Sequence, residues 1–293
     1  MPAPARKFVI TIFCLFILTF VNAQNQDSIP LSMRQLTNTI YLFEVNGVNL
    51  VVLQGAEGNL LVDAGYAAAA PLLRKKMSEN GIGPIKYLVN THWHFDHTSG
   101  NIQFAKESGI IASMATLNLL STDQLLFGET HKALAVWARP SIIVKDTLTI
   151  ITGDEVVKII SMPGGHTGGD VLVWFTRAGI LHIGDIIFSD MFPFIDTDHG
   201  GNIFKDADNI ASIIKSFPTE TRFIPGHGRE LNMEDLKSYE SMIRATVELV
   251  RKELGKKRSV AELQKAKILE AWKQWSVAFT SDDWIEMIAK SVK

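Results

Sequence analysis

Residues 90–101, NTHWHFDHTSGN, crowd three histidines and an aspartate into six positions, at His92, His94, Asp96 and His97. Imidazole and carboxylate groups packed into one loop cost free energy unless a binding partner satisfies them. The loop follows IKYLVN (residues 85–90), which reads as a short apolar strand. The fold must therefore hold these four side chains at the end of a strand, next to whatever binds them.

Further polar residues recur at the ends of other expected strands. His166 lies in PGGHTGGD after EVVKIIS (residues 155–161), Asp185 closes GILHIGD (residues 179–185), and His227 lies in PGHG after TRFI. Loops at one edge of a rigid sheet are where functional residues gather, and flanking glycines let the backbone turn sharply there. The sequence therefore predicts one site built from several strand ends.

Metal ions are the partner that suits this set of side chains. Neutral imidazole and carboxylate are the ligands that zinc takes when thiolates are absent. Residues 92, 94 and 96 alternate, so in an extended stretch their side chains share a face, while His97 lies on the other side and reaches a second ion. Five histidines and two aspartates are too many for one tetrahedral zinc, whereas two ions with a bridging carboxylate and water use them all.

The order of expected elements indicates a layered α/β architecture. Residues 37–65 read as hairpin strands, residues 67–81 as a helix, and strands and helices then alternate in two rounds. From Asp235 onward the pattern is helical, with a second stretch over roughly 261–275 and a third from Thr280, where a capping box begins. This order predicts two sheets packed face to face with helices outside. We expect the helical tail to cover the sheet rather than to shape a pocket, because an amphipathic helix usually serves the core.

The first 23 residues read as a secretory signal peptide. Arg6 and Lys7 precede an apolar run over residues 8–21, which ends in a small-residue pattern. The run is short for crossing a bilayer, although an N-terminal membrane anchor is the alternative. Cys14, the single cysteine of the chain, lies inside this run, so a mature protein would have neither a disulfide nor a thiolate ligand. We expect an exported protein, periplasmic or secreted, without stable membrane association after cleavage.

Composition narrows the classes of partner. Of the 293 residues, 46% are hydrophobic and 20% charged, which suits a globular core. The net charge is −2 and no long basic run occurs, so a nucleic-acid partner is not expected. A small-molecule substrate is the remaining expectation.

The motifs and their order along the chain resemble those of the metallo-β-lactamase superfamily. THWHFDH matches its H-x-H-x-D-H signature, GGHTGGD its second histidine motif, GD its bridging aspartate and PGHG its last histidine. The likeness covers roughly residues 35–255 and implies an α/β fold, a four-layer αββα sandwich. The expected division is a signal peptide over 1–23, the metallo-β-lactamase-fold domain over 24–255, and a C-terminal helical extension over 256–293 packed on that domain.

The resemblance also assigns roles to residues, namely a first zinc on His92, His94 and His166, a second on Asp96, His97 and His227, and Asp185 as the bridge. Zinc lowers the pKa of bound water to near ~7 and polarises a carbonyl oxygen, which provides a metal-bound hydroxide as nucleophile. Asp96 is the expected catalytic residue, since it can accept the proton of the nucleophile.

Asp63, in NLLVDAG, matches an aspartate that orients the metal loop in this family. It would fix a histidine tautomer by accepting the second N–H of the ring. The alternative is a simple turn residue before Ala64 and Gly65.

Substrate-binding residues are expected in the segment SDMFPFIDTDHGGN, which follows the bridging aspartate. Its aromatic residues can form an apolar wall over the metals, as ligand pockets commonly have, although a packed connection is the alternative. The candidates are Phe192, Phe194 and His199, together with Trp93, which either packs the metal loop down or reaches the mouth of the cleft.

These features predict an exported dinuclear zinc hydrolase that attacks an ester, lactone, thioester or lactam carbonyl. A β-lactamase proper fits the export signal, but such enzymes of this family carry cysteine or serine where this chain has Asp185. A second alternative is an iron-dependent persulfide or thiol dioxygenase on the same fold. A third is a binding protein without catalysis that keeps the metal for stability.

Overall fold

The strands form two β-sheets that are joined at one edge. The computed structural model describes residues 29–292, so the expected signal peptide lies outside the described residues. Within them, the first sheet contains β1 (Leu31–Gln35), β2 (Ile40–Val45), β3 (Val48–Leu53), β4 (Asn59–Val62), β5 (Ile85–Val89), β6 (Gly109–Ser113) and β9 (Ile142–Val144). The second sheet contains β10 (Thr147–Thr152), β11 (Glu155–Ser161), β12 (Val171–Phe175), β13 (Ile180–Phe188) and β14 (Arg222–His227). A single pair of residues, Val48 and His227, joins β3 to β14 and so connects the two sheets.

An apolar core fills the space between the two sheets. Val51, Val62 and Val89 of the first sheet belong to the same buried cluster as Val157 and Phe175 of the second. Strand β13 is buried along its whole length, because the other sheet covers one face and helices cover the other. This core fixes the strand ends at which the polar loops begin.

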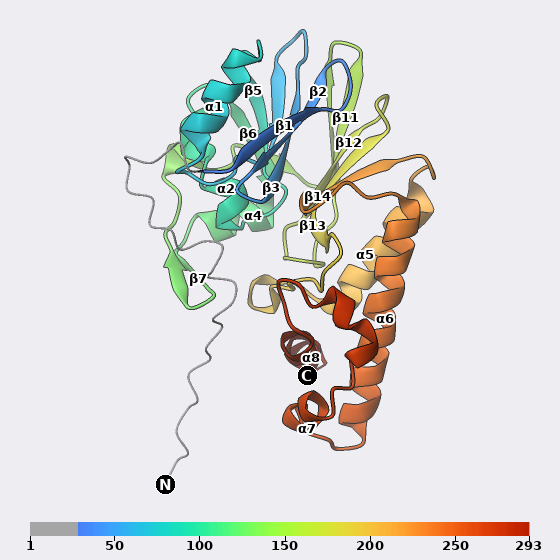
Figure 1. The fold of residues 1–293 in the computed structure, drawn as a ribbon. Coiled ribbons are helices and arrows are strands. Elements are labelled where there is room, and N and C mark those ends of the chain that lie inside the picture. Colours follow the sequence, from blue (N-terminus) through green and yellow to red (C-terminus); the bar gives the residue numbers. More distant parts are fainter. Residues whose placement is uncertain (1–28, 293) are drawn as a thin grey trace.

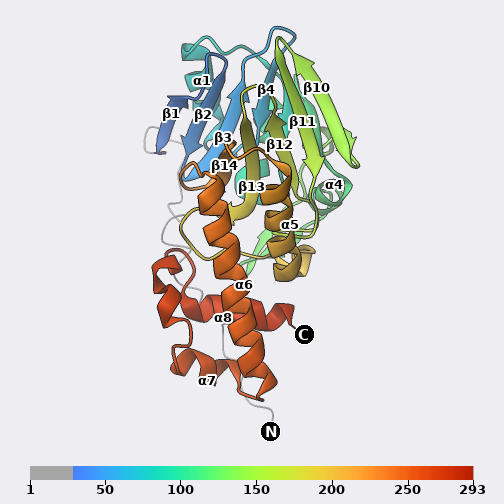
Figure 2. The same cartoon turned by 90° about the vertical axis from the view of Figure 1, so that its right-hand side faces the viewer.

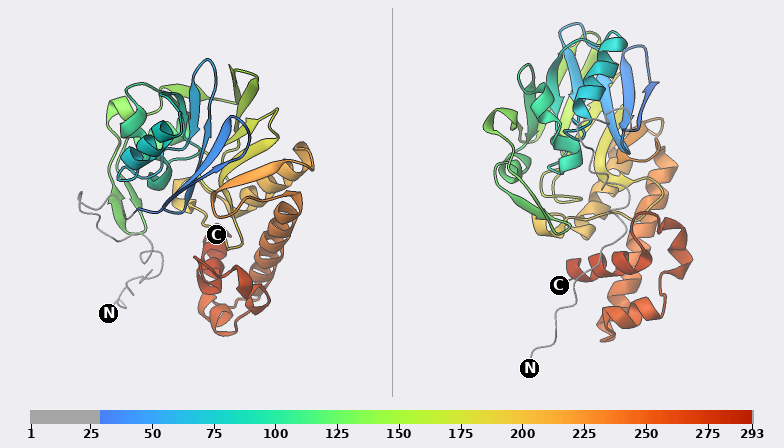
Figure 3. Two further views of the ribbon diagram at one scale, coloured as in Figure 1. Left: turned by 45° about the horizontal axis from the view of Figure 1, so that its top comes forward. Right: turned by 60° about the vertical axis from the view of Figure 1, so that its left-hand side comes forward.

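Helices cover the two outer faces, which completes an αββα sandwich as the sequence predicted. Helix α1 (Ala70–Glu79) packs Leu73 and Met77 on the first sheet. Helices α5 (Ile203–Ser216) and α6 (Met233–Gly255) lie on the second sheet, where Ile210 and Ile243 share a core with Leu181 of β13. Figure 3 shows the four layers in succession, from the teal helix through blue and yellow strands to the orange helices.

The C-terminal extension packs on α6 beyond the end of the sheet. Figures 1 and 2 show α7 (Val260–Lys265), a 3-10 helix η5 (Glu270–Trp275) and α8 (Ser281–Ser291) against the far half of α6. The helical stretch expected over roughly 261–275 is present as two segments, because Lys267 takes a left-handed φ of 49° that a right-handed helix cannot contain. The tail was expected to cover the sheet; instead Trp284 of α8 is fully buried against α6 and donates to Thr246 Oγ1 at 3.0 Å.

Shorter elements surround the edge at which the strands end. They are α2 (Phe95–Thr98), α3 (Asn101–Phe104), α4 (Met114–Leu120), the hairpin of β7 (Gln124–Leu126) and β8 (Glu129–His131), η3 (Val136–Ala138) and η4 (Thr197–His199). The sequence pattern had not indicated α4 or the β7–β8 hairpin. Within residues 29–292, no helix combines the length and apolar character that a membrane crossing requires.

Candidate metal centre

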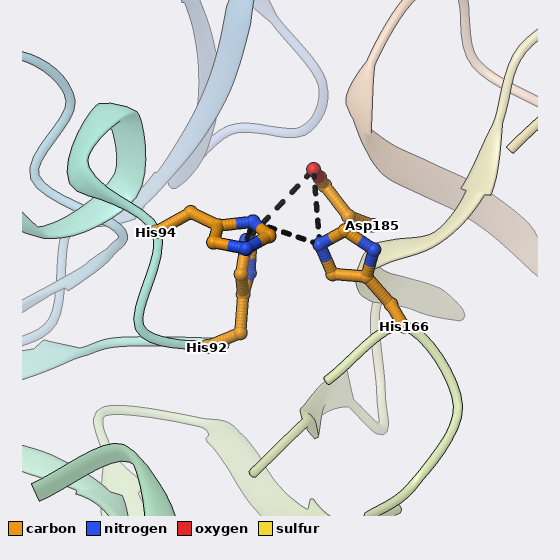
Figure 4. A group of neighbouring side chains, drawn as sticks. All are labelled: His92, His94, His166 and Asp185. Carbon is orange, nitrogen blue, oxygen red and sulfur yellow. Dashed lines mark hydrogen bonds and ion pairs between the residues drawn. The ribbon is translucent and has the colours of Figure 1, made fainter. Parts of the chain in front are cut away.

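Four side chains from three separate segments converge on one point (Figure 4). Nδ1 of His94 lies 3.0 Å from Nε2 of His92 and 2.9 Å from Nε2 of His166. Oδ2 of Asp185 lies 3.8 Å and 3.7 Å from those two Nε2 atoms. All four side chains are buried. The loops after β5 and β11 and the strand β13 thus bring three nitrogens and one oxygen together.

A second group lies beside the first. Oδ2 of Asp96 is 3.1 Å from Nε2 of His227 and 3.5 Å from Nε2 of His97. The carboxylate of Asp185 faces this group as well, with Oδ1 3.4 Å from Nε2 of His97 and Oδ2 3.4 Å from Nε2 of His227. Asp185 therefore stands between two groups, and all seven predicted side chains meet.

The expected sharing of a face by residues 92, 94 and 96 is correct only for the first two. Helix α2 begins at Phe95, so the backbone is no longer extended at Asp96. The helical turn carries Asp96 and His97 together toward His227, which places them in the second group. Local backbone geometry thus divides one short motif between two groups.

In each of the five histidines, the ring nitrogen that points away from the two groups, here called the outer nitrogen, lies beside an oxygen atom. The other ring nitrogen is called the inner nitrogen. The pairs are His92 Nδ1 with Thr91 Oγ1 at 3.0 Å, His94 Nε2 with Asp196 Oδ2 at 3.0 Å, His97 Nδ1 with Asp63 Oδ2 at 2.8 Å, His166 Nδ1 with the Phe194 carbonyl at 2.7 Å, and His227 Nδ1 with the Gly47 carbonyl at 2.9 Å. Carbonyl and carboxylate oxygens only accept, so the outer nitrogen carries the hydrogen. The Thr91 hydroxyl already donates to Asp63, which leaves it as the acceptor for His92.

This arrangement fits cations. A neutral imidazole whose outer nitrogen is protonated presents a lone pair from its inner nitrogen, so with all five rings neutral five lone pairs would be available to cations beside Asp96 and Asp185. Within the described part of the chain, Oδ1 of Asp185 is buried without a hydrogen-bond partner. A Cβ atom at Gly226 would overlap the Asp185 carboxylate, so only glycine fits there. Nitrogen and oxygen donors in this number suit zinc or iron.

The histidines of the two groups differ in charge in the metal-free protein. Burial lowers the pKa of His166 to about 4 and that of His92 well below its usual value, so both rings are neutral at pH 7. Burial also opposes the charged forms in the second group, but the nearby carboxylates outweigh it and raise the pKa of His227 to about 10 and that of His97 well above its usual value. At Asp96 burial favours the neutral form, but the rings of His97 and His227 outweigh it and lower the pKa to about 2. The second group is thus an array of alternating charges.

Asp63 supports both the metal loop and one ring. Its Oδ1 accepts from the Thr91 backbone N–H at 2.7 Å, and its Oδ2 accepts from Thr91 Oγ1 at 2.7 Å and from His97. The residue is fully buried and has a left-handed φ of 59°. Asp63 is therefore more than a turn residue.

The sequence did not indicate Asp196, which is the partner of three side chains. Its carboxylate accepts from Nε2 of His94, from Nε1 of Trp93 at 3.1 Å and from Nδ1 of His199 at 2.8 Å. The one signal in the sequence was an acid-rich loop, FIDTDHGG, that contains no ligand. Asp196 fixes the orientation of His94 as Asp63 fixes that of His97.

Of the four candidate pocket residues, only Phe194 lines the cavity above the two groups. Phe192 is fully buried and stacks on Trp284 in the helical core, so its assignment to the pocket is wrong. Trp93 and His199 do not reach the cavity either, because both are held by Asp196 with their rings 4.6 Å apart. The apolar wall is made instead by Phe95, Leu126, Phe127, Phe188, Phe194 and Phe279.

The chain belongs to the metallo-beta-lactamase superfamily, whose family model matches residues 44–227. It is a metal-dependent hydrolase of that superfamily. Curated relatives include a probable metallo-hydrolase of Methanocaldococcus jannaschii, 27% identical over an alignment of 179 residues that covers 58% of this chain and 82% of that protein. A hydroxyacylglutathione hydrolase of Rhodospirillum rubrum is 26% identical over 49% of this chain and 48% of its own length. The acyl-coenzyme A thioesterase MBLAC2 of Bos taurus is 26% identical over 51% of this chain and 63% of its own length.

Solved structures support the fold. A metallo-beta-lactamase from Pontibacter korlensis aligns with a TM-score of 0.62 at 17% identity, covering 73% of this chain and 99% of that one. The sec-alkylsulfatase Pisa1 from Pseudomonas sp. aligns with a TM-score of 0.71 at 13% identity, covering 89% of this chain and 50% of that one. At these identities the likeness concerns the fold alone.

Proposed function

We propose that the protein is an exported dinuclear zinc hydrolase that cleaves a carbonyl ester, lactone, thioester or lactam. The observation that carries the proposal is the orientation of the five histidines. Each outer nitrogen donates to an oxygen, so the five inner nitrogens point into one space beside the carboxylates of Asp96 and Asp185. Such a donor set is costly to bury unless cations occupy it.

In this proposal one ion is held by His92, His94 and His166, the other by Asp96, His97 and His227, and both by Asp185. Two zinc ions supply a water of lowered pKa and an electrophile for the substrate oxygen. Asp96 keeps 14% of its side chain exposed and is ionised at neutral pH, so its carboxylate can accept a proton from the attacking water and pass it to the leaving group. The aromatic wall limits the access of bulk water to the reacting carbonyl.

The names of two relatives support acyl transfer to water as the reaction. One is called an acyl-coenzyme A thioesterase and the other a hydroxyacylglutathione hydrolase. The described chain spans about half to two thirds of their lengths, so the substrate class is a proposal for this protein. Thioesters and oxygen esters are accordingly the first substrates to assay.

The test combines metal analysis with a substrate panel. We expect two zinc equivalents per purified chain, and hydrolysis of at least one member of a panel of esters, thioesters, lactones and nitrocefin-like lactams. Asp96→Asn should lower kcat by about 10²-fold or more. The matched control, Asp154→Asn on the exposed turn between β10 and β11, should leave kcat unchanged. One iron per chain with oxygen consumption would overturn the proposal, and so would an Asp96→Asn variant as active as the wild type.

Export has its own test. The sequence of residues 1–23 supports it, and this segment lies outside the described residues. N-terminal sequencing of protein secreted from a Gram-negative host should start at Gln24. Recovery of the intact chain from the cytoplasm would count against export without touching the hydrolase assignment.

A further inference from the structure

We propose that the C-terminal extension forms one wall of a groove that binds an unbranched apolar chain of the substrate. The proposal rests on the proposed hydrolase function and names its substrate class. The groove has a volume of about 170 Å³ and lies between the β7–β8 hairpin, the loop over residues 194–198, and α8. Figure 1 shows β7 and α8 at the same end of the molecule, below the strand ends that carry the metal centre.

The groove adjoins the cavity over the metal centre. Leu126, Phe127, Phe194 and Phe279 line both spaces. The ring of Phe194 lies 5.8 Å from that of His94, 4.7 Å from that of Phe127, and stacks on Phe279 at 5.7 Å with an interplanar angle of 18°. A carbonyl at the metals can therefore be continued by an apolar chain that passes over Phe194 into the groove.

The walls of the groove are anchored, so the groove is a preformed site. On the hairpin side, the ring of His131 stacks on Phe95 of the metal loop at 4.3 Å with an interplanar angle of 11°. On the other side, α8 begins with a capping box between Thr280 and Asp283 directly after Phe279. Trp284 then fixes the helix to α6. A binding site whose walls are already ordered loses less entropy when the ligand binds.

The lining combines a run of apolar side chains with charged residues from α8 and from the loop over residues 194–198. Leu125, Ile195 and Met287 continue the surface beyond Phe279, and Leu125 is 64% exposed although it is apolar. The charged lining residues lie on two elements: Asp283, Glu286 and Lys290 on α8, and Asp196 and Asp198 on the loop over residues 194–198. Asp283 accepts from the Thr280 backbone N–H at 2.8 Å, and Glu286 accepts from Gln264 at 3.0 Å. Asp196 accepts from His94, Trp93 and His199. The apolar side chains fit methylene groups, and the acidic side chains beside them disfavour an anionic substituent.

Phe279 and Met287 lie outside residues 44–227, the part that the family model matches. The preference for an apolar chain is therefore a property that the extension adds to the hydrolase fold. The apolar chain can belong to the acyl side or to the leaving group of the substrate, and these two sources have the same chemistry.

Two substrate series distinguish the sources. In one, p-nitrophenyl esters carry acyl chains from two to ten carbons; in the other, acetyl thioesters carry alkyl thiols of the same lengths. On the side that occupies the groove, kcat/KM should rise about fourfold for each added methylene until the groove is filled. Met287→Trp should abolish most of this rise by filling the groove, whereas Met287→Leu should preserve it. Ile151→Trp, at an exposed position on β10, controls for added bulk and should leave both series unchanged.

A binding measurement makes the groove testable without turnover. A fluorescent probe with an undecanoyl chain should bind the metal-loaded wild type and bind at least tenfold more weakly to Met287→Trp and to Leu125→Arg. If acetyl substrates are cleaved but both series are flat with chain length and the probe does not bind, the groove is refuted and the hydrolase stands. If nothing is cleaved while the probe binds as expected, the hydrolase is refuted and the groove stands as an apolar-chain site.

Discussion

Asp63→Asn is the substitution that most directly tests how the second group of the metal centre is oriented. Asp63 accepts three hydrogen bonds, from Thr91 N and Oγ1 at 2.7 Å each and from His97 Nδ1 at 2.8 Å. Asparagine has the same shape but only one accepting oxygen. If that oxygen keeps the Thr91 backbone N–H, the amide NH₂ faces His97 Nδ1, and the ring must move its proton to Nε2.

A proton on Nε2 of His97 removes the lone pair that faces Asp96 and Asp185. Losing a hydrogen bond to a charged group costs about 1.5–3 kcal/mol, which corresponds to a factor of roughly 10–150 in affinity. Removing the oxygen that orients a metal-bound histidine typically weakens metal binding about 10–100-fold. We therefore expect the dissociation constant of the second zinc ion to rise about 10–100-fold, with a much smaller change for the first.

The assay is a zinc titration in competition with a chromophoric chelator of known affinity. Backbone strain does not confuse the result, because the left-handed φ of 59° at Asp63 suits asparagine as well as aspartate. Asp190→Asn is the matched control, since Asp190 has the same φ of 59° but is exposed and bound to Arg229. A folded Asp63→Asn protein that binds both ions within twofold of the wild type would refute the reasoning.

Three further predictions follow from charge and packing. Near pH 7, zinc binding should release about two protons from His97 and His227, whose raised pKa values keep them charged without metal, and calorimetry in buffers of different ionisation enthalpy should count them. Without metal, the stabilisation from charged His227 should be complete below its unfolded pKa of about 6.5 and should be lost as the pH rises through about 10. Urea unfolding of chelator-treated protein from pH 6 to 10 measures this change. A free energy of unfolding that stays constant over this range would contradict the prediction. Trp284→Ala should lower the free energy of unfolding by about 3–5 kcal/mol, because it leaves a cavity beside Phe192 and removes the hydrogen bond that Thr246 Oγ1 accepts. Urea unfolding measures the loss, and a loss below about 1 kcal/mol would contradict the prediction.

Convergence of the seven polar side chains could be predicted from sequence because each one is tied to a local signal. His92, His166 and His227 all follow apolar runs that predict strands, and parallel or adjacent strand ends share an edge. The residues that support them have no such signal. Asp196 meets His94 only through the folding of a long loop back over the metal loop, and nothing in the spacing of the two positions records that contact.

The tail illustrates the same limit. Its amphipathic pattern and the capping box at Thr280 predict α8 correctly, because both are local features. Its location is set by the burial of Trp284 between α6 and Phe192, which involves residues from three distant segments. The sequence also could not show that Phe192 lies in the helical core while Phe194 lines the cavity. A loop without strand or helix periodicity gives no rule for the direction of its side chains.

The metal centre lies where the two sheets join, and this position gives it a role in the docking of the two halves of the fold. The single pair of Val48 and His227 connects the sheets, and the ring of His227 reaches back to Gly47 while it faces Asp96. Each group of the centre takes side chains from both halves of the chain, so neither is complete until the C-terminal half has been made and has docked. Ions bound there would link the two sheets where they join. Bound ions would then be present only after the two halves have docked. A chain without ions would lack this link, and its halves could separate more easily.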